Sequence, residues 1–330
     1  MTASKRIIRI VIIICRHCAI VLAGITLCGC SLEDERDLCC ERYNMMRYVY
    51  RPYGVDEFQG NIHTLRHLLY DRRGRYLREM PSGSDLQYQT LALPEGSYTM
   101  VTLGNFGDGQ RLNLGDAASL EELELSVASR FEDSDGVRGN CDEIFWGISS
   151  FDVDASGYIT CHDYRRKYTD YTYPATEMNN IHCHLKVRVE WANMPLYFGD
   201  YILELSDVAS HYSLDPGRSQ DAGGFTVPPP GSPSVCRLRV PLWGDELEGE
   251  FVTLRYSDDH IPTLRIFHDD LQIGPDIDLR RAFAAWGWKP DEIHVQEYAI
   301  DIKLYNNGRA EVSPHFEGVI SDWVNGGNFS

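Results

Sequence analysis

The clearest pattern of apolar and polar positions in this chain is a strict alternation over residues 181–191. From Ile181 every second residue is apolar, up to Trp191, whereas the residues between them are polar or charged. A repeat of two is that of a β-strand, because successive side chains point to opposite faces of a sheet. The pattern predicts a strand with one face in a core and the other in water.

Shorter segments before this strand also carry β patterns. A turn at 71–74 separates the apolar positions of 62–70 from Tyr76 and Leu77, which predicts a hairpin. Pro94-Glu95-Gly96 is a turn between two further strands, 91–93 and 97–103. Residues 116–129 fit either a short helix or a strand, and the pattern does not decide between them. The other strands predicted in this half are 45–53, 145–151 and 158–161.

The second half continues in the same way but adds one helix. Asp278 can cap a helix over 279–286, in which Leu279, Phe283 and Trp286 fall on one face. The three prolines 228–230 cannot join a sheet ladder, so they belong to a surface connection. The predicted strands are 201–205, 235–242, 250–256, 263–267, 293–305 and 310–316, the last two as a hairpin.

These elements predict a mainly β protein with one short helix in its C-terminal half. A chain of 330 residues, or about 300 without its first 29, exceeds what one core comfortably organises, so two domains are expected. We place the boundary near residue 178, just before the alternating strand.

The first 30 residues have the layout of a bacterial export signal: basic residues, then an apolar body over 7–27, then small residues. The sequence Leu27-Cys28-Gly29-Cys30 resembles the lipobox of bacterial lipoproteins, in which a diacylglyceryl group is attached to the Cys thiol. This resemblance implies that 1–29 are removed and that Cys30 becomes the lipidated first residue.

The alternative for 7–27 is a transmembrane helix, since the segment is long enough to cross a bilayer. Arg16 interrupts it, at a cost of about 2.5–3.5 kcal/mol near a membrane centre, and this favours the signal. Glu33, Asp34 and Glu35 follow the lipobox and resemble the surface-export tag of Bacteroidetes lipoproteins. A solvated spacer is the alternative for this acidic stretch.

The net charge argues against several partners. The formal charge of the whole chain is −18, and removal of residues 1–29 takes away four cations and no acid, which leaves −22. Such an acidic chain lacks the basic surface that nucleic acids and anionic lipid surfaces require. We therefore expect no nucleic-acid partner.

Six of the ten cysteines lie after Cys30. An even number in an exported chain permits disulfides, although the neighbours Cys39 and Cys40 are poorly placed to bond each other. No CxxC pair occurs among them, which argues against a zinc ribbon. The candidate disulfide cysteines are Cys39, Cys40, Cys141, Cys161, Cys183 and Cys236.

Two groups of residues suggest metal ligands. Asp152, Asp154 and Ser156, followed by a glycine, match the start of an EF-hand calcium loop, but position twelve is Asp163 instead of Glu and no amphipathic helices flank it. A hairpin turn is the favoured interpretation. His182 and His184 have a spacing that zinc sites use, but the sequence shows no third ligand, and a polar pair on a wet strand face is the simpler reading.

No known catalytic motif stands out. The sequence contains no G-x-S-x-G, Walker, H-E-x-x-H or dinucleotide-binding motif. Acid pairs such as 258–259 and 269–270 could serve a glycosidase only at a set separation in space. Trp286 and Trp288 could stack on sugars, although packing inside the protein is the commoner fate of such rings. We expect no enzyme activity and no cofactor.

A set of weak motifs, taken in order, resembles the FimB/Mfa-type fimbrial anchor lipoproteins of Bacteroidetes. The resemblance covers most of the chain after residue 29. The motifs are the lipobox, the acidic run into Asp37-Leu38-Cys39, Tyr70-Asp71 with Gly74, the stretch from Leu93 to Asn105, the strand of 181–191, Gln296-Glu297-Tyr298 and Ile320-Ser321-Asp322-Trp323.

This resemblance implies two tandem transthyretin-like Greek-key β-sandwich domains, over 44–178 and 179–330, behind a lipidated tether over 30–43. It also implies a surface-exposed lipoprotein of the outer membrane whose partners are fimbrial shaft subunits, bound by exchange of a β-strand. Residues 310–323 are the candidate strand, either donated or displaced, unless they simply complete their own sheet. The alternatives are a fimbrial accessory or tip adhesin, a surface glycan-binding lipoprotein and a hydrolase.

Overall fold

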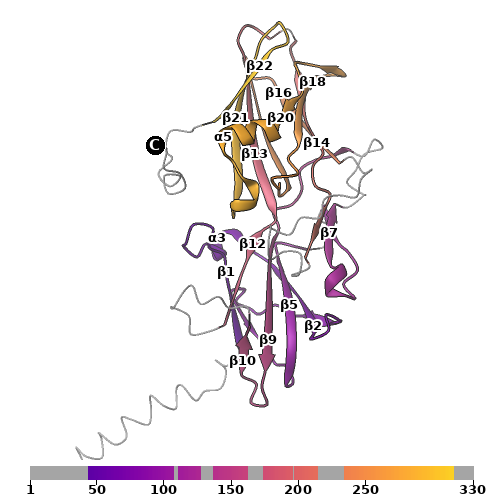
Figure 1. Cartoon of the computed structure of the whole chain (residues 1–330), viewed down its shortest axis with the longest axis vertical. Coiled ribbons are helices and arrows are strands. Elements are labelled where there is room, and N and C mark those ends of the chain that lie inside the picture. Colours follow the sequence, from indigo (N-terminus) through magenta and orange to yellow (C-terminus); the bar gives the residue numbers. More distant parts are fainter. Residues whose placement is uncertain are drawn as a thin grey trace, which may run out of the picture.

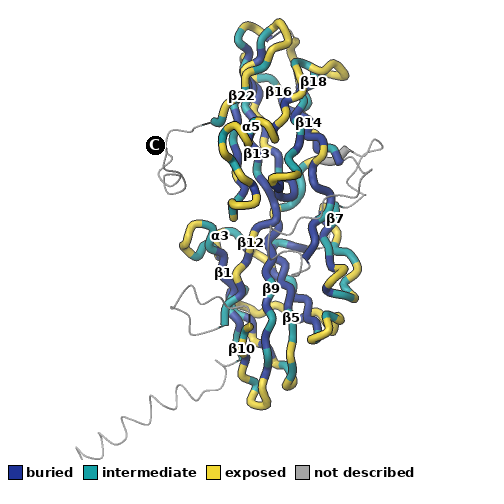
Figure 2. Tube along the Cα trace, in the orientation of Figure 1, coloured by how far each residue is buried: buried dark blue, intermediate teal, exposed yellow. Residues whose placement is uncertain are grey.

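The computed structural model describes residues 44–107, 111–127, 137–162, 174–195, 197–214 and 234–315. These residues form an elongated, mainly β molecule in which two groups of sheets follow one another along the long axis (Figure 1). Figure 2 shows buried positions along the middles of the strands and exposed positions in the turns at both ends. The mainly β prediction is confirmed. Within the described residues, no helix is long and apolar enough to cross a bilayer.

The N-terminal group is built around a central sheet with apolar side chains on both faces. On its strand β5 (Gly96–Gly104), Met100 joins one core, whereas Val101 and Leu103 join another. The sheet order is β10 (Ile159–Cys161), β9 (Phe145–Val153), β5, β2 (Leu65–Asp71) and β3 (Tyr76–Met80), and β12 (Asn179–Asn180) also pairs with β9.

Two small sheets cover these faces. One has the order β11 (Ala175–Glu177), β1 (Met45–Val49), β4 (Tyr88–Thr90), and the other β15 (His211–Ser213), β7 (Glu124–Val127), β6 (Leu112–Leu114). The short helix α3 (Phe58–Asn61) lies between β1 and β2, and the 3₁₀ turn η1 (Leu120–Glu122) lies between β6 and β7.

The C-terminal group is a sandwich of two sheets around one apolar core. The first sheet has the order β17 (Glu246–Leu254), β13 (His182–Trp191), β21 (Gln296–Leu304), β22 (Ala310–Pro314). The second has the order β19 (Leu271–Gln272), β18 (Thr263–His268), β14 (Asp200–Ser206), β16 (Val235–Pro241), β8 (Val137–Arg138), and β20 (Ile277–Asp278) also pairs with β18.

The helix of this half forms where the sequence predicts it. Helix α5 (Leu279–Trp286) begins after Asp278, whose side chain accepts a hydrogen bond from the Arg281 amide, 3.1 Å away. It ends at Gly287, whose φ of 72° lies in the left-handed region that glycine adopts without strain. Leu279 and Phe283 are buried in the core. A 3₁₀ turn, η3 (Pro290–Glu292), follows.

Two predictions from the pattern need correction, and one question that the pattern left open is resolved. The strand placed at 91–93 is at Tyr88–Thr90 instead, where it pairs with β1, and Leu91 is buried without belonging to a strand. Residues 116–129 contain both alternatives, a 3₁₀ turn followed by β7. His182 is not on a wet face: it is buried, because the ring of Phe145 packs edge-on against it at 5.2 Å.

Strands from each half of the sequence also pair with sheets of the other half. Strands β12 and β15 follow residue 178 but pair with β9 and β7, whereas β8 precedes it and pairs in parallel with β16. The domain limits 44–178 and 179–330 therefore stay a prediction. Near this boundary, strands of each half belong to sheets of the other half.

Candidate functional site

The outer edge of β22 is the feature of the C-terminal sandwich best suited to take a partner strand. Among the residues that the structure describes, β22 pairs with β21 alone, so its other side ends the sheet. Ala310 and Val312 pack partly against the core, whereas Glu311 and Ser313 are exposed. Over the described residues, the segment 310–323 thus completes its own sheet, and 316–323 lie outside them.

The register of the hairpin identifies which backbone groups face outward. The amide of Tyr305 donates to the carbonyl of Arg309 at 2.9 Å, and that of His315 to Ala299 at 2.8 Å. Because antiparallel pairs alternate, odd-numbered residues of β22 bond to β21 and even-numbered ones point away. The N–H and C=O groups of Val312 therefore face the open edge.

Two other edges of this sandwich are covered by the chain itself, whereas the short strands β19 and β20 also lie at an edge. The side chain of Asn140 binds both the amide of Val252, at 3.0 Å, and the carbonyl of Glu250, at 2.9 Å, along the outer side of β17. The amide of Cys141 donates to the carbonyl of Val252 at 2.7 Å. In the second sheet, β8 covers β16. Among the described residues, β22 is thus the uncovered end of its sheet, and the chain itself occupies part of the opposite edge.

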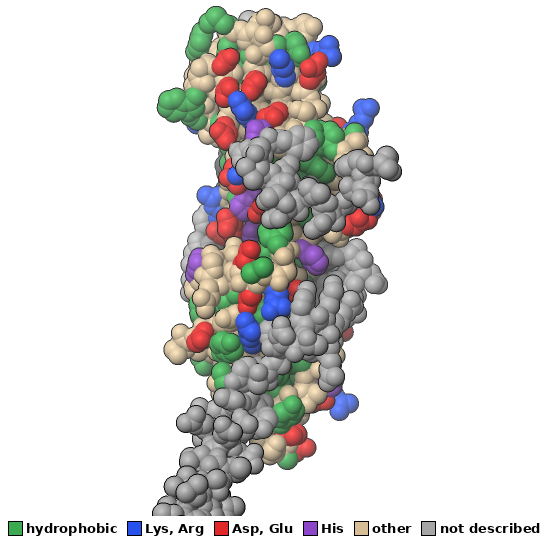
Figure 3. Space-filling model, turned by 90° about the vertical axis from the view of Figure 1, so that its left-hand side faces the viewer, with side chains coloured by type: hydrophobic (Ala, Val, Ile, Leu, Met, Phe, Trp, Pro, Cys, Tyr) green, Lys and Arg blue, Asp and Glu red, His purple; other side chains and the backbone are tan. Residues whose placement is uncertain are grey.

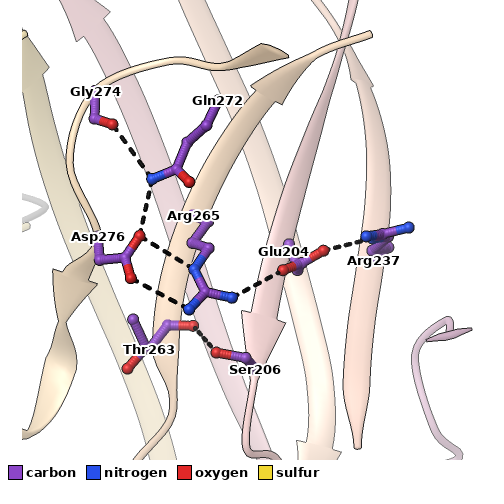
Figure 4. A network of polar contacts seen from close by, with 8 residues as sticks. All are labelled: Glu204, Ser206, Arg237, Thr263, Arg265, Gln272, Gly274 and Asp276. Atoms are coloured by element: carbon purple, nitrogen blue, oxygen red, sulfur yellow. Dashed lines mark hydrogen bonds and ion pairs between the residues drawn. The ribbon is translucent and has the colours of Figure 1, made fainter. Parts of the chain in front are cut away.

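A buried charged network stiffens the second sheet. Figure 4 shows Glu204 between two guanidinium groups: Arg237 Nε lies 2.5 Å from one carboxylate oxygen and Arg265 Nη1 3.4 Å from the other. Arg265 also contacts Asp276 at 3.1 and 3.2 Å, which raises the pKa of Arg265. Since the three residues at Glu204 belong to β14, β16 and β18, the network ties three neighbouring strands together.

The predicted calcium loop is a hairpin turn between β9 and β10. The carboxylate of Asp154 accepts hydrogen bonds from the amides of Ser156, at 2.8 Å, and Tyr158, at 2.9 Å. These contacts, first of all the hydrogen bond from the Ser156 side chain, lower the pKa of Asp154. Asp152 pairs with His162 at 2.8 Å. Asp163 lies outside the described residues, and calcium binding stays a prediction.

Three of the candidate cysteines come together around the C-terminal sandwich. Cys183 on β13 and Cys236 on β16 belong to its core, and Cys141 and Cys236 line one small pocket. Burial raises the pKa of the Cys183 thiol, which keeps it protonated and unreactive. Cys161 is at the end of β10. Within the described residues these cysteines are thiols and not disulfides, and disulfide formation stays a prediction.

The features that could have supported catalysis or sugar binding have structural roles instead. Trp286 and Trp288 pack on each other with ring centroids 4.9 Å apart, and Trp288 packs edge-on against Phe283. Asp258 and Asp291 accept hydrogen bonds from each other's amides, at 3.3 and 3.1 Å, which closes a loop.

The predicted lipidation residue Cys30 and the predicted export tag Glu33, Asp34 and Glu35 lie before residue 44, outside the described residues. The same holds for the candidate disulfide cysteines Cys39 and Cys40. On the face drawn in Figure 3, acidic and basic side chains are interspersed and form no broad basic patch.

Two groups of β-sheets that follow one another, one of them with an open outer edge, place the chain in the class of mainly β proteins built from tandem sandwich-like units. It belongs to the family of fimbrillin-A associated anchor proteins Mfa1 and Mfa2, whose family model matches residues 42–325. This family consists of fimbrial anchor and adhesin-type structural proteins, so a fimbria-associated role at the cell surface and a structural function follow.

Solved structures share the fold at low sequence identity. A proposed adhesin from Bacteroides thetaiotaomicron is 16% identical with a TM-score of 0.58, over 83% of this chain and 96% of that one. Proposed polysaccharide-binding proteins from the same species are 15% identical with a TM-score of 0.57, over 83% and 98%. The fimbrial anchor protein Mfa2 from Porphyromonas gingivalis is 14% identical with a TM-score of 0.52, over 78% and 89%. No curated protein matches the sequence.

Proposed function

We propose that this protein anchors a fimbria to the outer membrane through lipid on Cys30 and binds a shaft subunit at the open edge of β22. The observation that carries the proposal is the outer edge of β22, with which no described strand pairs, in a chain of the fimbrial anchor family. A lipobox-like sequence before the fold supports the membrane end of the same proposal.

The two ends of the molecule suit these two tasks. The first described residues belong to the N-terminal group of sheets, and the β21–β22 hairpin lies at the opposite end of the long axis (Figure 1). A lipid at Cys30 and a strand bound at β22 would therefore act at separate ends. Several acyl chains on one cysteine hold a protein in a membrane far more firmly than a single chain does.

Replacement of Cys30 tests the membrane end. In Cys30→Ala cells, fimbriae are expected in the culture medium and not on the cells, as counted by electron microscopy and immunoblot. Cys28→Ala is the matched control, because it changes a neighbouring cysteine and keeps Cys30. Fimbriae that stay attached in Cys30→Ala cells contradict the anchor function.

The acidic tag has its own test. Neutral replacements of Glu33, Asp34 and Glu35 are expected to protect the protein from protease added to intact cells, because the protein would then remain on the inner side of the outer membrane. Unchanged cleavage would show that these residues are only a spacer.

Val312→Pro tests the docking edge. Proline removes the outward N–H of Val312 but leaves the bonds to β21, and prolines are tolerated on edge strands. We expect the variant to fold, as judged by circular dichroism, and to lose the shaft subunits that co-purify with the wild type. Val312→Thr, which keeps the N–H and the branched shape, is the control. Equal recovery of shaft subunits with the proline variant would exclude β22 as the docking strand.

A further inference from the structure

Three side chains from segments far apart in the sequence converge at the junction between the two groups of sheets. One ring nitrogen each of His182 and His184 and one carboxylate oxygen of Glu143 lie within 4.8 Å of one another. His184 Nε2 is 3.6 Å from Glu143 Oε1, and the two imidazole centroids are 5.2 Å apart. Both histidines are on β13, whereas Glu143 precedes β9.

The hydrogen bonds of both histidines fix which nitrogen can bind a metal. His182 Nδ1 is 3.1 Å from the carbonyl oxygen of Ile144, which can only accept, so Nδ1 carries the hydrogen and Nε2 the lone pair. His184 Nδ1 lies 2.8 Å from Glu250 Oε1, and a carboxylate likewise accepts. A metal-binding histidine commonly donates its other N–H to a carbonyl or carboxylate, and both histidines have such a partner.

We propose that Glu143, His182 and His184 form a zinc site, with water as the fourth ligand. Two imidazoles and one carboxylate are a known zinc ligand set, whereas calcium and magnesium prefer oxygen ligands alone. Ligands at about 2.0–2.1 Å from a tetrahedral zinc ion lie about 3.3 Å apart, so ligand atoms up to 4.8 Å apart must close by at most about 1.5 Å. Glu143 can supply its part of this movement, because its side chain is 57% exposed.

The position of the site suggests what the metal does there. Glu143 belongs to the strand connection that enters the N-terminal sheet, and β13 begins the C-terminal sandwich. The amide of Ile181 already donates to the carbonyl of Ile144 at 3.0 Å. A zinc ion would add a second link between these segments and would stabilise the folded chain, since an ion bound only to the native state shifts the unfolding equilibrium.

The test uses the full-length protein, purified in detergent and freed of metal with EDTA. Zinc alone is titrated by calorimetry and by competition with a chromophoric chelator, and thermal unfolding is followed at about 100 μM zinc. We expect one zinc ion per chain and a rise in Tm of at least about 2 °C. His184→Phe and Glu143→Gln are each expected to lower the affinity at least tenfold, and Glu250→Gln roughly 10–100-fold.

His162→Phe is the matched control, because His162 is an exposed histidine with a single carboxylate partner, Asp152. It should bind zinc like the wild type. The proposal is wrong if the wild type binds zinc no more tightly than the His184→Phe, Glu143→Gln double variant, or if magnesium raises the Tm as much as zinc. Both variants replace partly or fully exposed side chains, so folding is expected to survive them. The result does not depend on the anchor function.

Discussion

Glu204→Gln should destabilise the C-terminal sandwich by about 2 kcal/mol. The Glu204 side chain is 5% exposed and sits between Arg237 and Arg265, at 2.5 and 3.4 Å. The amide has the same size as the carboxylate but no charge, and its NH₂ group would face a guanidinium donor. Removing one partner of a fully buried ion pair costs about 3–5 kcal/mol. The arginine side chains are 41% and 32% exposed, and Arg265 keeps Asp276, so water and the remaining pair reduce the loss.

Urea unfolding near pH 7, followed by tryptophan fluorescence, measures this loss of stability. The urea concentration at the midpoint should fall, while the dependence of the unfolding free energy on urea stays unchanged. Asp200→Asn is the control on the same two strands: Asp200 lies 3.7 Å from Arg239, and both side chains are more than half exposed. Its effect should stay within about 0.5 kcal/mol, as for other exposed pairs. The reasoning fails if Glu204→Gln costs less than about 0.5 kcal/mol, or if the two variants lose the same stability.

Two further predictions concern the N-terminal sheets. His67 is fully buried, and burial lowers its pKa to about 4, from about 6.5 when unfolded. The unfolded chain therefore binds more protons, and stability should fall as the pH drops from about 6.5 to 4, by up to about 3 kcal/mol. The difference between the urea midpoints at about pH 7.5 and 4.5 should be smaller in His67→Leu than in the wild type. An equal difference in both proteins would refute the role assigned to His67. Gly147→Ala should lower stability by roughly 1–3 kcal/mol, because a Cβ would lie 2.8 Å from Met178 Sδ and from Thr176 Cγ2. Gly60→Ala, with nothing within 4 Å, should not lower it.

Much of the C-terminal half could be predicted from its sequence. The alternation of 181–191 gave a strand within one residue of β13, and the Asp278 cap gave the limits of α5. Both signals are local: a repeat of two, or a capping residue before an amphipathic turn, depends on neighbouring residues alone. The C-terminal hairpin was predictable for the same reason, because Asn306-Asn307-Gly308 separates two strand patterns.

The contacts that build the candidate sites depend on distant residues and could not be predicted. Glu143 is near His182 only because β9 and β12 pair, and His182 is buried only because Phe145 packs on it. The same holds for Glu204, whose partners come from two other strands. In the sequence these residues are isolated polar positions, and the pairing of the strands determines which of them come into contact.

The covered edges of the C-terminal sandwich bear on how an anchor could end a polymer. A sheet with two open edges can pair at both, which leads to open-ended association. In this sandwich, Asn140 and Cys141 bind the outer side of β17, and β8 pairs with the outer side of β16. Among the described residues, β22 is therefore the longest uncovered edge of the sandwich. In the anchor function proposed above, β22 accepts one neighbour while the lipid proposed at Cys30 holds the other end, so the polymer does not continue towards the membrane. This asymmetry favours a terminal subunit over a shaft subunit, and it predicts that a purified shaft subunit binds this protein in a one-to-one ratio.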